Sequence, residues 1–373
     1  MTGLYIHIPF CASRCVYCGF YSTTLPALRD AYVDALCQEL TLRAEELPAD
    51  EALTTIYLGG GTPSQLTTEQ LDRLFSYIYK VYRPQPVEVT MECNPDDITP
   101  AFADWIAQSP IDRISMGAQT FSDERLRLLR RRHTAEVRRA TTLLRQAGIR
   151  NISIDLMFGF PGETLADWEQ DIDEALRLGV EHISAYSLMY EEGTTLHRWL
   201  SEGRIQEIDD DLSLRMYDCL VDRLTAAGYR HYEISNFALP QRESRHNSSY
   251  WRDVPYMGLG ASAHSFDGRQ RSWNVADIET YIAAIGRGER PCTVEALDLD
   301  THYEDVVLTS LRTAEGIDLG KIQRDFGSQR LYFLLAAADQ DLRQGYLVLE
   351  DDHLRLTRRG IYLSDGITAR LFV

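Results

Sequence analysis

The chain has 373 residues, a formal net charge of −18 and 44% hydrophobic residues. This length accommodates one large domain and a smaller one, and the composition is that of a globular protein. The acidic balance argues against a nucleic-acid partner, because phosphate backbones attract proteins that carry excess positive charge.

Neither a targeting peptide nor a membrane span is visible in the sequence. The longest apolar run near the start, residues 4–10, is interrupted by His7 and Pro9 and is too short for either. Of the seven cysteines, three are crowded at Cys11, Cys15 and Cys18, which is unlike the even, dispersed set of a disulfide framework. We therefore expect a cytoplasmic protein.

From residue 3 to about residue 190, short strand-like runs alternate with amphipathic helical runs. Within the helical runs, apolar residues recur at spacings of three and four. The strand-like runs cover residues 4–8, 55–58, 87–91, 113–116, 151–156 and 182–187, and the helical runs cover residues 31–46, 68–82, 124–130, 135–146 and 164–178. Six β/α units in series predict parallel strands joined by helices, as either an open sheet or a partial barrel.

The alternation of strand-like and helical runs ends after about residue 190. A helical run over 209–227 leads into a loop-rich stretch over 236–275, and from about residue 300 the chain is helical again. Two strand-like runs, 346–349 and 354–356, then flank an acidic turn, which is typical of a winged-helix-like α+β domain. We predict three parts: 1–235, a loop-rich connecting region over 236–298 that contains an HNxxYW motif, and a C-terminal domain over 299–373. The acidic charge favours a packing or partner role for this last domain over DNA binding.

Three cysteines follow the first predicted strand with the spacing Cys-x3-Cys-x2-Cys. Thiolates are the usual ligands of iron–sulfur clusters, and a [4Fe–4S] cubane normally takes four of them. A loop with Cys11, Cys15 and Cys18 leaves one iron open, and that iron can chelate the amino and carboxylate groups of S-adenosylmethionine (SAM). The pattern predicts a [4Fe–4S] cluster that cleaves SAM to a 5′-deoxyadenosyl radical. A zinc site made by the three cysteines and a distant histidine is the weaker alternative.

Further polar and glycine residues follow the predicted strands. Tyr17 lies between two of the cysteines, where it would cover the cluster and contact the adenine. The glycines of 59–62 would let backbone groups approach the SAM amino group closely. Glu92, Gln119 and Asp155 end or lie within the next strands, and three such residues at neighbouring strand ends indicate one ligand site rather than three separately buried polar groups.

The cationic run over residues 125–132 is more typical of a solvated helix face than of a binding patch. His7, on one face of the first strand together with Tyr5, is as typical of a satisfied core histidine as of a functional one.

Motifs along nearly the whole chain resemble the family of oxygen-independent coproporphyrinogen III oxidases and, within it, the HemW-type radical SAM haem chaperones. They include LYIHIPFC, YLGGGTPS, MECNPDDI, SMGAQTF, LLRRRHT, DLMFGFPGET, RHNSSYW and YMGLGASAHSF. The resemblance implies a TIM-like partial (βα)6 barrel with a smaller C-terminal domain. It also implies that SAM, or the substrate cavity beside it, is contacted by Tyr5, Gly60, Gly61, Thr62, Glu92, Gln119, Arg131, Asp155 and Met189.

Two features separate the chaperones from the oxidase within this resemblance. The oxidase has a fourth cysteine two residues after the third, where this chain has Phe20, and it has an extension before the segment that begins here at Tyr5. The HNxxYW signature of the chaperones is present at 246–251. Its imidazole, His246, could ligate haem iron and its aromatic rings could cover a porphyrin, although a loop or interior role for His246 is the simpler interpretation.

The resemblance thus implies a haem chaperone linked to porphyrin biosynthesis, which binds haem and transfers it to apo-haemoproteins such as membrane respiratory enzymes. It further implies an electron donor for the cluster and transient association with a membrane. Oxidative decarboxylation of coproporphyrinogen III to protoporphyrinogen IX is the alternative function, disfavoured by Phe20 and the missing extension. Radical-mediated modification of haem is a third reading that no residue specifically favours.

Overall fold

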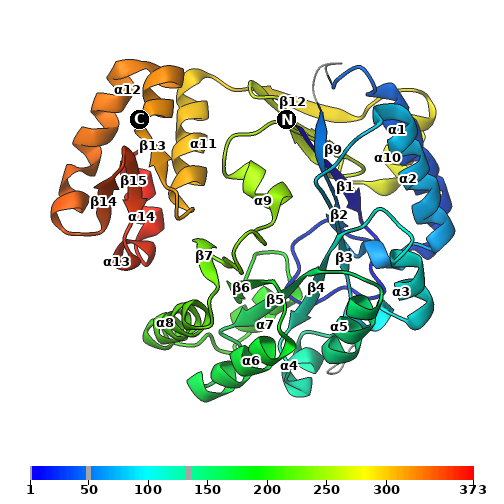
Figure 1. Cartoon of the computed structure of the whole chain (residues 1–373), viewed down its shortest axis with the longest axis horizontal. Helices are drawn as coiled ribbons and strands as arrows, with labels where there is room; N and C mark the ends of the chain where they lie inside the picture. Colours follow the sequence, from blue (N-terminus) through cyan, green and yellow to red (C-terminus); the bar gives the residue numbers. More distant parts are fainter. Residues whose placement is uncertain (1, 48–51, 132–135) are drawn as a thin grey trace.

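The computed structural model describes residues 2–47, 52–131 and 136–373 (Figure 1). A large α/β unit and a smaller C-terminal unit stand side by side, joined through the yellow strands and helix α11. Arg132 and the first residue of the helix expected over 135–146 lie outside the described residues.

The large unit is organised around six parallel strands in chain order. They are β1 (Thr2–Ile8), β2 (Leu53–Gly60), β3 (Glu88–Cys93), β4 (Arg113–Gln119), β5 (Asn151–Phe158) and β6 (His182–Ser187). In the described part of the chain β1 does not pair with β6. Instead β1 pairs with β9 (Tyr256–Leu259), and β6 pairs with β8 (Asn236–Ala238), which is followed at the edge by β7 (Arg230–Glu233). The predicted partial (βα)6 barrel is therefore confirmed, and its open side is the gap between β1 and β6.

Helices cover the outer face of the six strands. They are α1 (Arg29–Leu42), α2 (Thr68–Tyr82), α3 (Pro100–Ile106), α4 (Asp123–Leu128), α5 (Val137–Gln146), α6 (Leu165–Leu178) and α8 (Asp210–Ala226), and α7 (Thr195–Ser201) lies between α6 and α8 in the chain. Helix α2 shows why they form: Thr67 and Gln70 make a capping box, and the spacing of three and four buries Leu71, Leu74 and Ile78 against the sheet. Burial of each such leucine stabilises the fold by about 1.5–3 kcal/mol.

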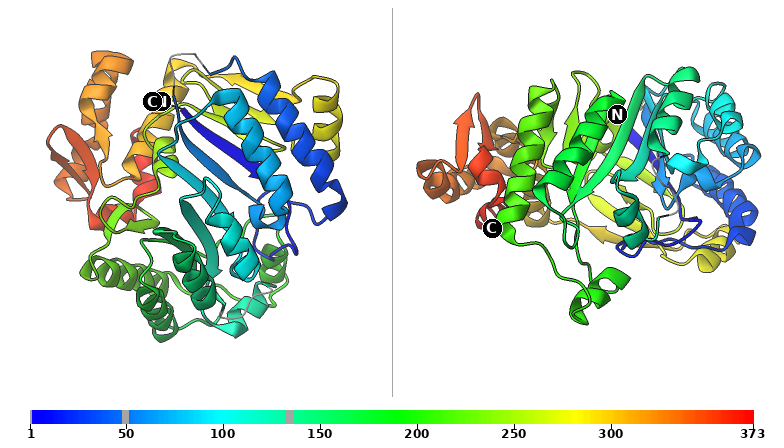
Figure 2. Two further views of the ribbon diagram at one scale, coloured as in Figure 1. Left: turned by 45° about the vertical axis from the view of Figure 1, so that its right-hand side comes forward. Right: turned by 90° about the horizontal axis from the view of Figure 1, so that it is seen from below.

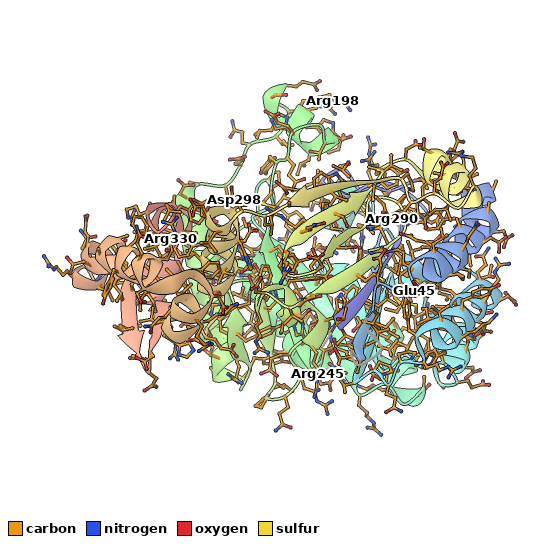
Figure 3. The ribbon with its side chains drawn as sticks, turned by 90° about the horizontal axis from the view of Figure 1, so that it is seen from above. Glu45, Arg198, Arg245, Arg290, Asp298 and Arg330 are labelled. Atoms are coloured by element: carbon orange, nitrogen blue, oxygen red, sulfur yellow. The ribbon has the colours of Figure 1, made fainter. Side chains whose placement is uncertain are left out.

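Helix α7 differs from the others, because it projects from the body of the molecule (Figure 2). Figure 3 labels Arg198 on this helix. The Leu196 N–H donates to the Val16 carbonyl oxygen at 2.9 Å, and both side chains are buried in one small cluster. Helix α7 is thereby attached to the loop that carries the cysteines.

The expectation of a loop-rich connecting region over 236–298 was wrong. This segment contains α9 (Arg245–Tyr250), β9, β10 (His264–Phe266), β11 (Gln270–Asn274), α10 (Ile278–Gly286) and β12 (Cys292–Ala296). The four strands extend the barrel sheet beyond β1, so among the described residues the sheet has twelve strands and runs from β12 to β7. These strands have three to five residues, which is too short for an alternating pattern to show in the sequence. The division of the chain at 235 and 298 remains a prediction.

The C-terminal unit is an α+β domain with a core of its own. It contains α11 (Leu299–Leu311), β13 (Ile317–Asp318), α12 (Leu319–Arg343), β14 (Leu347–Glu350), β15 (His353–Leu356), α13 (Arg358–Ile361) and α14 (Ser364–Arg370). The sheet order is β13-β15-β14, and the expected hairpin is its β14–β15 pair. Figure 3 labels Asp298, the residue that caps α11 at the junction with the barrel strands. Within the described residues, no helix combines the length and apolar character needed to cross a membrane.

Ion pairs connect the two units. Arg312 approaches Glu233 at 2.9 Å, and Lys321 approaches Asp253 at 2.9 Å. Arg252 forms a two-pronged pair with the Glu315 carboxylate, its shorter distance being 2.6 Å. The contact between barrel and C-terminal domain is thus largely ionic at these points.

Candidate functional site

A cavity of about 180 Å³ lies where strands β1 to β5 end, and we call it the cysteine cavity. Its walls bring together most of the residues predicted for the cluster and SAM. They include Cys11, Cys15, Tyr17, Cys18, Gly60, Gly61, Thr62, Glu92, Gln119, Arg131 and Asp155. The carboxyl ends of parallel strands are where α/β folds build their sites.

The cysteine loop is closed at its base by backbone hydrogen bonds. The Cys11 N–H donates to the Thr23 carbonyl oxygen at 2.9 Å, and the Thr23 N–H donates to the Pro9 carbonyl oxygen at 2.7 Å. The Thr62 hydroxyl lies 3.7 Å from the Cys11 sulfur. Burial and the neighbouring thiols raise the pKa of Cys18, and burial likewise raises the pKa of Cys11. Thiolates in this loop therefore need a positively charged partner such as iron.

None of these three cysteines forms a disulfide within the described residues, and all are partly exposed at the cavity. Within the described ranges, no three histidine, cysteine, aspartate or glutamate side chains converge on one point as a single metal ion requires. In a cubane each thiolate binds a different iron, so its three ligands stay apart. The donor set in the cysteine cavity is the one that a [4Fe–4S] cluster with one open iron uses.

The glycine segment after β2 forms a wall in which a side chain has no room. A methyl group on Gly61 would lie 2.7 Å from the Pro9 carbonyl carbon, and one on Gly59 would lie 2.9 Å from a Glu92 oxygen. Gly60 has a φ of 108°, in the region that favours glycine. These glycines therefore let the segment pack closely against the cysteine loop and Glu92, and Gly60 and Gly61 also line the cavity in which SAM is predicted to bind.

Two carboxyl groups form the acidic side of the cavity. The Glu92 carboxylate accepts hydrogen bonds from the Tyr57 hydroxyl at 2.8 Å and from the Gly60 N–H at 3.1 Å. Burial raises the pKa of Glu92 to about 7 and the pKa of Asp155 to about 6. A cationic ligand would offset the cost of ionising these buried groups, and SAM carries both an ammonium and a sulfonium.

Arg131 faces the carboxyl groups across the cavity. Its guanidinium donates to the Gly117 carbonyl oxygen at 2.5 Å and lies 3.7 Å from the Cys15 sulfur, and its Nε has no hydrogen-bond partner in the described part of the chain. Gln119 has a φ of 67°, a strained backbone conformation for a residue other than glycine. Gln119 lies at the irregular end of β4, where the register shifts between Gly117 and Gln119.

The interpretation of residues 125–132 as a solvated helix face was wrong for two of its arginines. Arg125 is mostly buried and pairs with Glu163, Asp167 and Asp171 at 3.1–3.4 Å. Helix α4 ends at Leu128, so the chain turns and directs Arg131 into the cavity. The sequence pattern extended the helix to residue 130, two residues beyond its end, and only the resemblance pointed to Arg131 as a residue of the site.

Two residues implied by the resemblance do not line the cysteine cavity. Met189 follows β6 with 63% of its surface exposed and lies outside this wall. Tyr5 lines two neighbouring cavities instead, and its hydroxyl lies 3.1 Å from the His7 Nδ1. His7 also contacts the Tyr21 carbonyl oxygen at 3.0 Å, so both ring nitrogens have partners, as in a satisfied core histidine.

A larger cavity of about 550 Å³ adjoins the cysteine cavity, and we call it the aromatic cavity. Its aromatic walls are Tyr5, Phe20, Tyr21, Tyr250, Trp251, Tyr256 and Phe266. Phe20 lines both cavities and is 70% exposed. A third space of about 440 Å³, lined by Glu92 and Asp155 on one side and by Tyr250 and Trp251 on the other, connects the two along the barrel interior.

His246 does not face any of these cavities. Its side chain has no exposed surface, its Nδ1 lies 2.8 Å from the Thr55 hydroxyl and its Nε2 lies 2.8 Å from the Tyr250 hydroxyl. Burial lowers the pKa of His246 to about 3, so the ring is neutral. The two oxygens of the Glu88 carboxylate accept hydrogen bonds from the backbone N–H groups of Arg245 and His246. These bonds anchor α9 at the start of β3. This is the interior histidine of the simpler interpretation.

Arg113 is a further residue near the site, and no sequence motif pointed to it. Its side chain is almost fully buried, lines the third space, and has two guanidinium nitrogens without partners in the described chain. One signal could have indicated Arg113: it is a charged residue at the start of a strand whose other residues are mostly buried.

Comparison with known proteins agrees with this geometry. Residues 5–175 match the radical SAM superfamily, and residues 297–363 match the HemN C-terminal domain. A solved structure of coproporphyrinogen III oxidase (HemN) from Escherichia coli superposes with a TM-score of 0.85 at 22% identity, covering 100% of this chain and 90% of that one. The fold and the cysteine cavity define a radical SAM protein, a class that carries a [4Fe–4S] cluster and SAM.

Relatives place the chain more narrowly. It is 34% identical to heme chaperone HemW of Bacillus subtilis, with 98% of each chain covered. It is 35% identical to heme chaperone HemW of Mycobacterium tuberculosis, over 99% of this chain and 94% of that one. It is 29% identical to a mitochondrial radical S-adenosyl methionine domain-containing protein 1 of Danio rerio, over 98% and 86%. The chain belongs to the HemW family.

Proposed function

We propose that this protein binds haem and passes it to apo-haemoproteins, membrane respiratory enzymes among them. The observation that carries the proposal is the aromatic cavity beside the cysteine cavity, in a chain similar over nearly its full length to proteins named heme chaperone. A porphyrin is a flat aromatic ligand, and aromatic side chains stack on such a face.

We further propose that Cys11, Cys15 and Cys18 hold the [4Fe–4S] cluster and that the rest of the cysteine cavity binds SAM. Gly60, Gly61 and Thr62 give backbone access, Glu92 and Asp155 attract the positive groups, and Arg131 attracts the carboxylate. Tyr17 and Gln119 close the space around them. When bound, the reduced cluster supplies the electron that splits SAM into methionine and a 5′-deoxyadenosyl radical. An electron donor outside this chain must reduce the cluster.

The competing function is oxidative decarboxylation of coproporphyrinogen III, which the fold of HemN makes worth testing. Phe20 stands where the resemblance gives the oxidase a further cysteine. Its exposed ring lines both the cysteine cavity and the aromatic cavity, so it supplies an apolar surface in place of a thiol.

The experiment combines both functions on one reconstituted, anaerobic sample. One portion is titrated with haem and then mixed with apomyoglobin as a general haem acceptor, and absorption spectra follow haem from donor to acceptor. A second portion receives reductant, SAM and coproporphyrinogen III. We expect stoichiometric haem binding, transfer to apomyoglobin, and no protoporphyrinogen IX. Formation of protoporphyrinogen IX would replace the chaperone proposal with the oxidase.

A further inference from the structure

Two histidines line the aromatic cavity, His7 and His264, and in the described part of the chain only His264 has ring nitrogens without a hydrogen-bond partner. His264, the first residue of β10, lines the cavity and is exposed to it. Its ring stacks on Trp273, with centroids 5.9 Å apart and an angle of 23° between the planes. Among the described residues, neither ring nitrogen of His264 makes a hydrogen bond or an ion pair.

The other histidines near this cavity are engaged. His7 uses both nitrogens, on Tyr5 and on the Tyr21 carbonyl, and His246 uses both on hydroxyl groups. His302 lies 2.9 Å from an Asp253 oxygen. A haem iron takes a ring nitrogen that has no stronger partner, which leaves His264 as the available imidazole in this wall.

The backbone that carries His264 is held in place. Residues of β10 pair with β11 in register, His264 opposite Trp273. A methyl group on Gly258 would lie only 2.0 Å from the His264 carbonyl oxygen, so the β9 and β10 chains are in close contact here. Ser262, two residues before β10, has a φ of 64°. This conformation is costly for serine and is found most often near functional sites.

The space in front of His264 suits a flat macrocycle. Its volume of about 550 Å³ lies inside the range of about 300–1,000 Å³ that ligand pockets span. Tyr250 and Trp251 on one side and Phe20 on another supply aromatic surface. The aromatic residues of the HNxxYW motif therefore line the cavity although the histidine of that motif is turned away from it.

We propose that His264 is the axial ligand to the iron of haem bound in the aromatic cavity, and that His246 is a positioning residue that holds Tyr250 in the cavity wall. This inference rests on the proposed function, because it takes haem as the ligand. It transfers the iron-binding role from the motif histidine to a histidine that the sequence analysis did not single out.

The test is a titration with ferric haem of the wild-type protein and of His264→Ala, His246→Ala and, as a control on helix α7, His197→Ala. Absorption and electron paramagnetic resonance spectra report the axial ligand. We expect His264→Ala to lose the histidine-type spectrum and to bind haem roughly 10-fold or more weakly, since even outer-shell partners of a metal cost about 10–100-fold. Free imidazole should restore the spectrum of His264→Ala, a rescue that a merely structural role would not produce.

The outcomes separate the two proposals. If the wild type does not bind haem, the proposed function fails. If the wild type binds haem and His264→Ala shows the same spectrum and affinity, His264 is not the ligand and the proposed function stands. If His246→Ala alone removes the histidine-type spectrum while circular dichroism shows an intact fold, the motif histidine is the ligand and this inference is overturned. His197→Ala should behave as the wild type in every case.

Discussion

The cysteine cavity and the aromatic cavity share Phe20 but are constructed differently. The cysteine cavity is assembled from strand ends and loops that follow one another along the first 155 residues. The aromatic cavity takes its walls from β1, the cysteine loop, α9, β9, β10 and helix α11 of the C-terminal domain. The first is a property of the barrel alone, whereas the second exists only when both units are in place.

This difference suggests that the two cavities can be disabled separately. Changes in the cysteine cavity should abolish the chemistry of the cluster and SAM and leave haem binding intact. Changes in the wall of the aromatic cavity should weaken haem binding and leave the chemistry of the cluster and SAM intact. The four predictions below test this separation, beginning with the largest expected effect.

Removal of one cluster ligand is the most severe change. Cys15→Ala should abolish the brown colour of the reconstituted cluster and the formation of 5′-deoxyadenosine, because two thiolates do not hold a cubane with an open iron. Haem binding should be unchanged. Cys292→Ala, on β12 at the far edge of the sheet, is the matched control and should keep the cluster. A normal cluster in Cys15→Ala would remove that residue from the ligand set.

Gly61→Ala tests the backbone wall. The added methyl group would meet the Pro9 carbonyl carbon at 2.7 Å and the Ile8 oxygen at 2.8 Å, both of them backbone atoms that cannot yield without moving the cysteine loop. We expect SAM affinity, measured by calorimetry on the reconstituted protein, to fall by roughly 10–100-fold, as for other small misplacements of binding groups. Gly286→Ala, where a methyl group meets nothing within 4 Å, is the control. Equal affinities for both variants would contradict the proposed close approach.

Glu92→Gln should affect SAM binding and stability in opposite directions. Because burial raises the pKa of Glu92 from 4.5 to about 7, the folded protein holds this proton more tightly than the unfolded chain. The protonated Glu92 carboxyl therefore favours the folded state below about pH 4.5. This contribution to stability is lost as the pH rises through about 7. Between about pH 5 and about pH 8, the free energy of unfolding of the ligand-free variant should increase relative to that of the wild type by on the order of 2–3 kcal/mol.

The same substitution should weaken SAM binding by roughly tenfold at neutral pH, since a charge-assisted hydrogen bond contributes about 1.5–3 kcal/mol. Denaturant unfolding at several pH values and calorimetry with SAM provide the two readings. A stability difference that does not change with pH would show that Glu92 titrates normally in the folded protein.

Tyr250→Phe is the mildest change and acts on the aromatic cavity. It removes the hydroxyl that lies 2.8 Å from the His246 Nε2 and leaves that buried nitrogen without a partner. We expect a loss of about 1–3 kcal/mol in the free energy of unfolding, measured in urea. SAM binding should be unaffected. Tyr332→Phe, at a position that is 72% exposed, should change stability very little and serves as the control.

The same contrast explains how much could be predicted from the sequence. Strand positions and the three cysteines were predictable, because parallel strands and cluster loops leave local patterns within a few residues. Residues such as Glu92 and Asp155 could be grouped because consecutive parallel strands end at one edge. The cysteine cavity is therefore largely visible in the linear sequence.

The aromatic cavity could not be predicted in this way. Strands β9 to β12 are too short to show alternation, and their pairing beside β1 is a long-range event. One partner of His246 is equally non-local: Thr55 is on β2, nearly two hundred residues earlier in the chain. A motif can therefore identify a family correctly while giving the wrong orientation for one of its side chains.

The ionic contact between the barrel and the C-terminal domain has a consequence for the lifetime of a bound ligand. Helix α11 contributes Asp305, Leu308 and Thr309 to the aromatic cavity, so this wall belongs to a unit that ion pairs such as Arg252–Glu315 hold in place. Dissolved salt screens exposed charges within a Debye length of about 8–10 Å. We expect the residence time of haem to shorten as ionic strength rises, measurable by stopped-flow transfer to apomyoglobin.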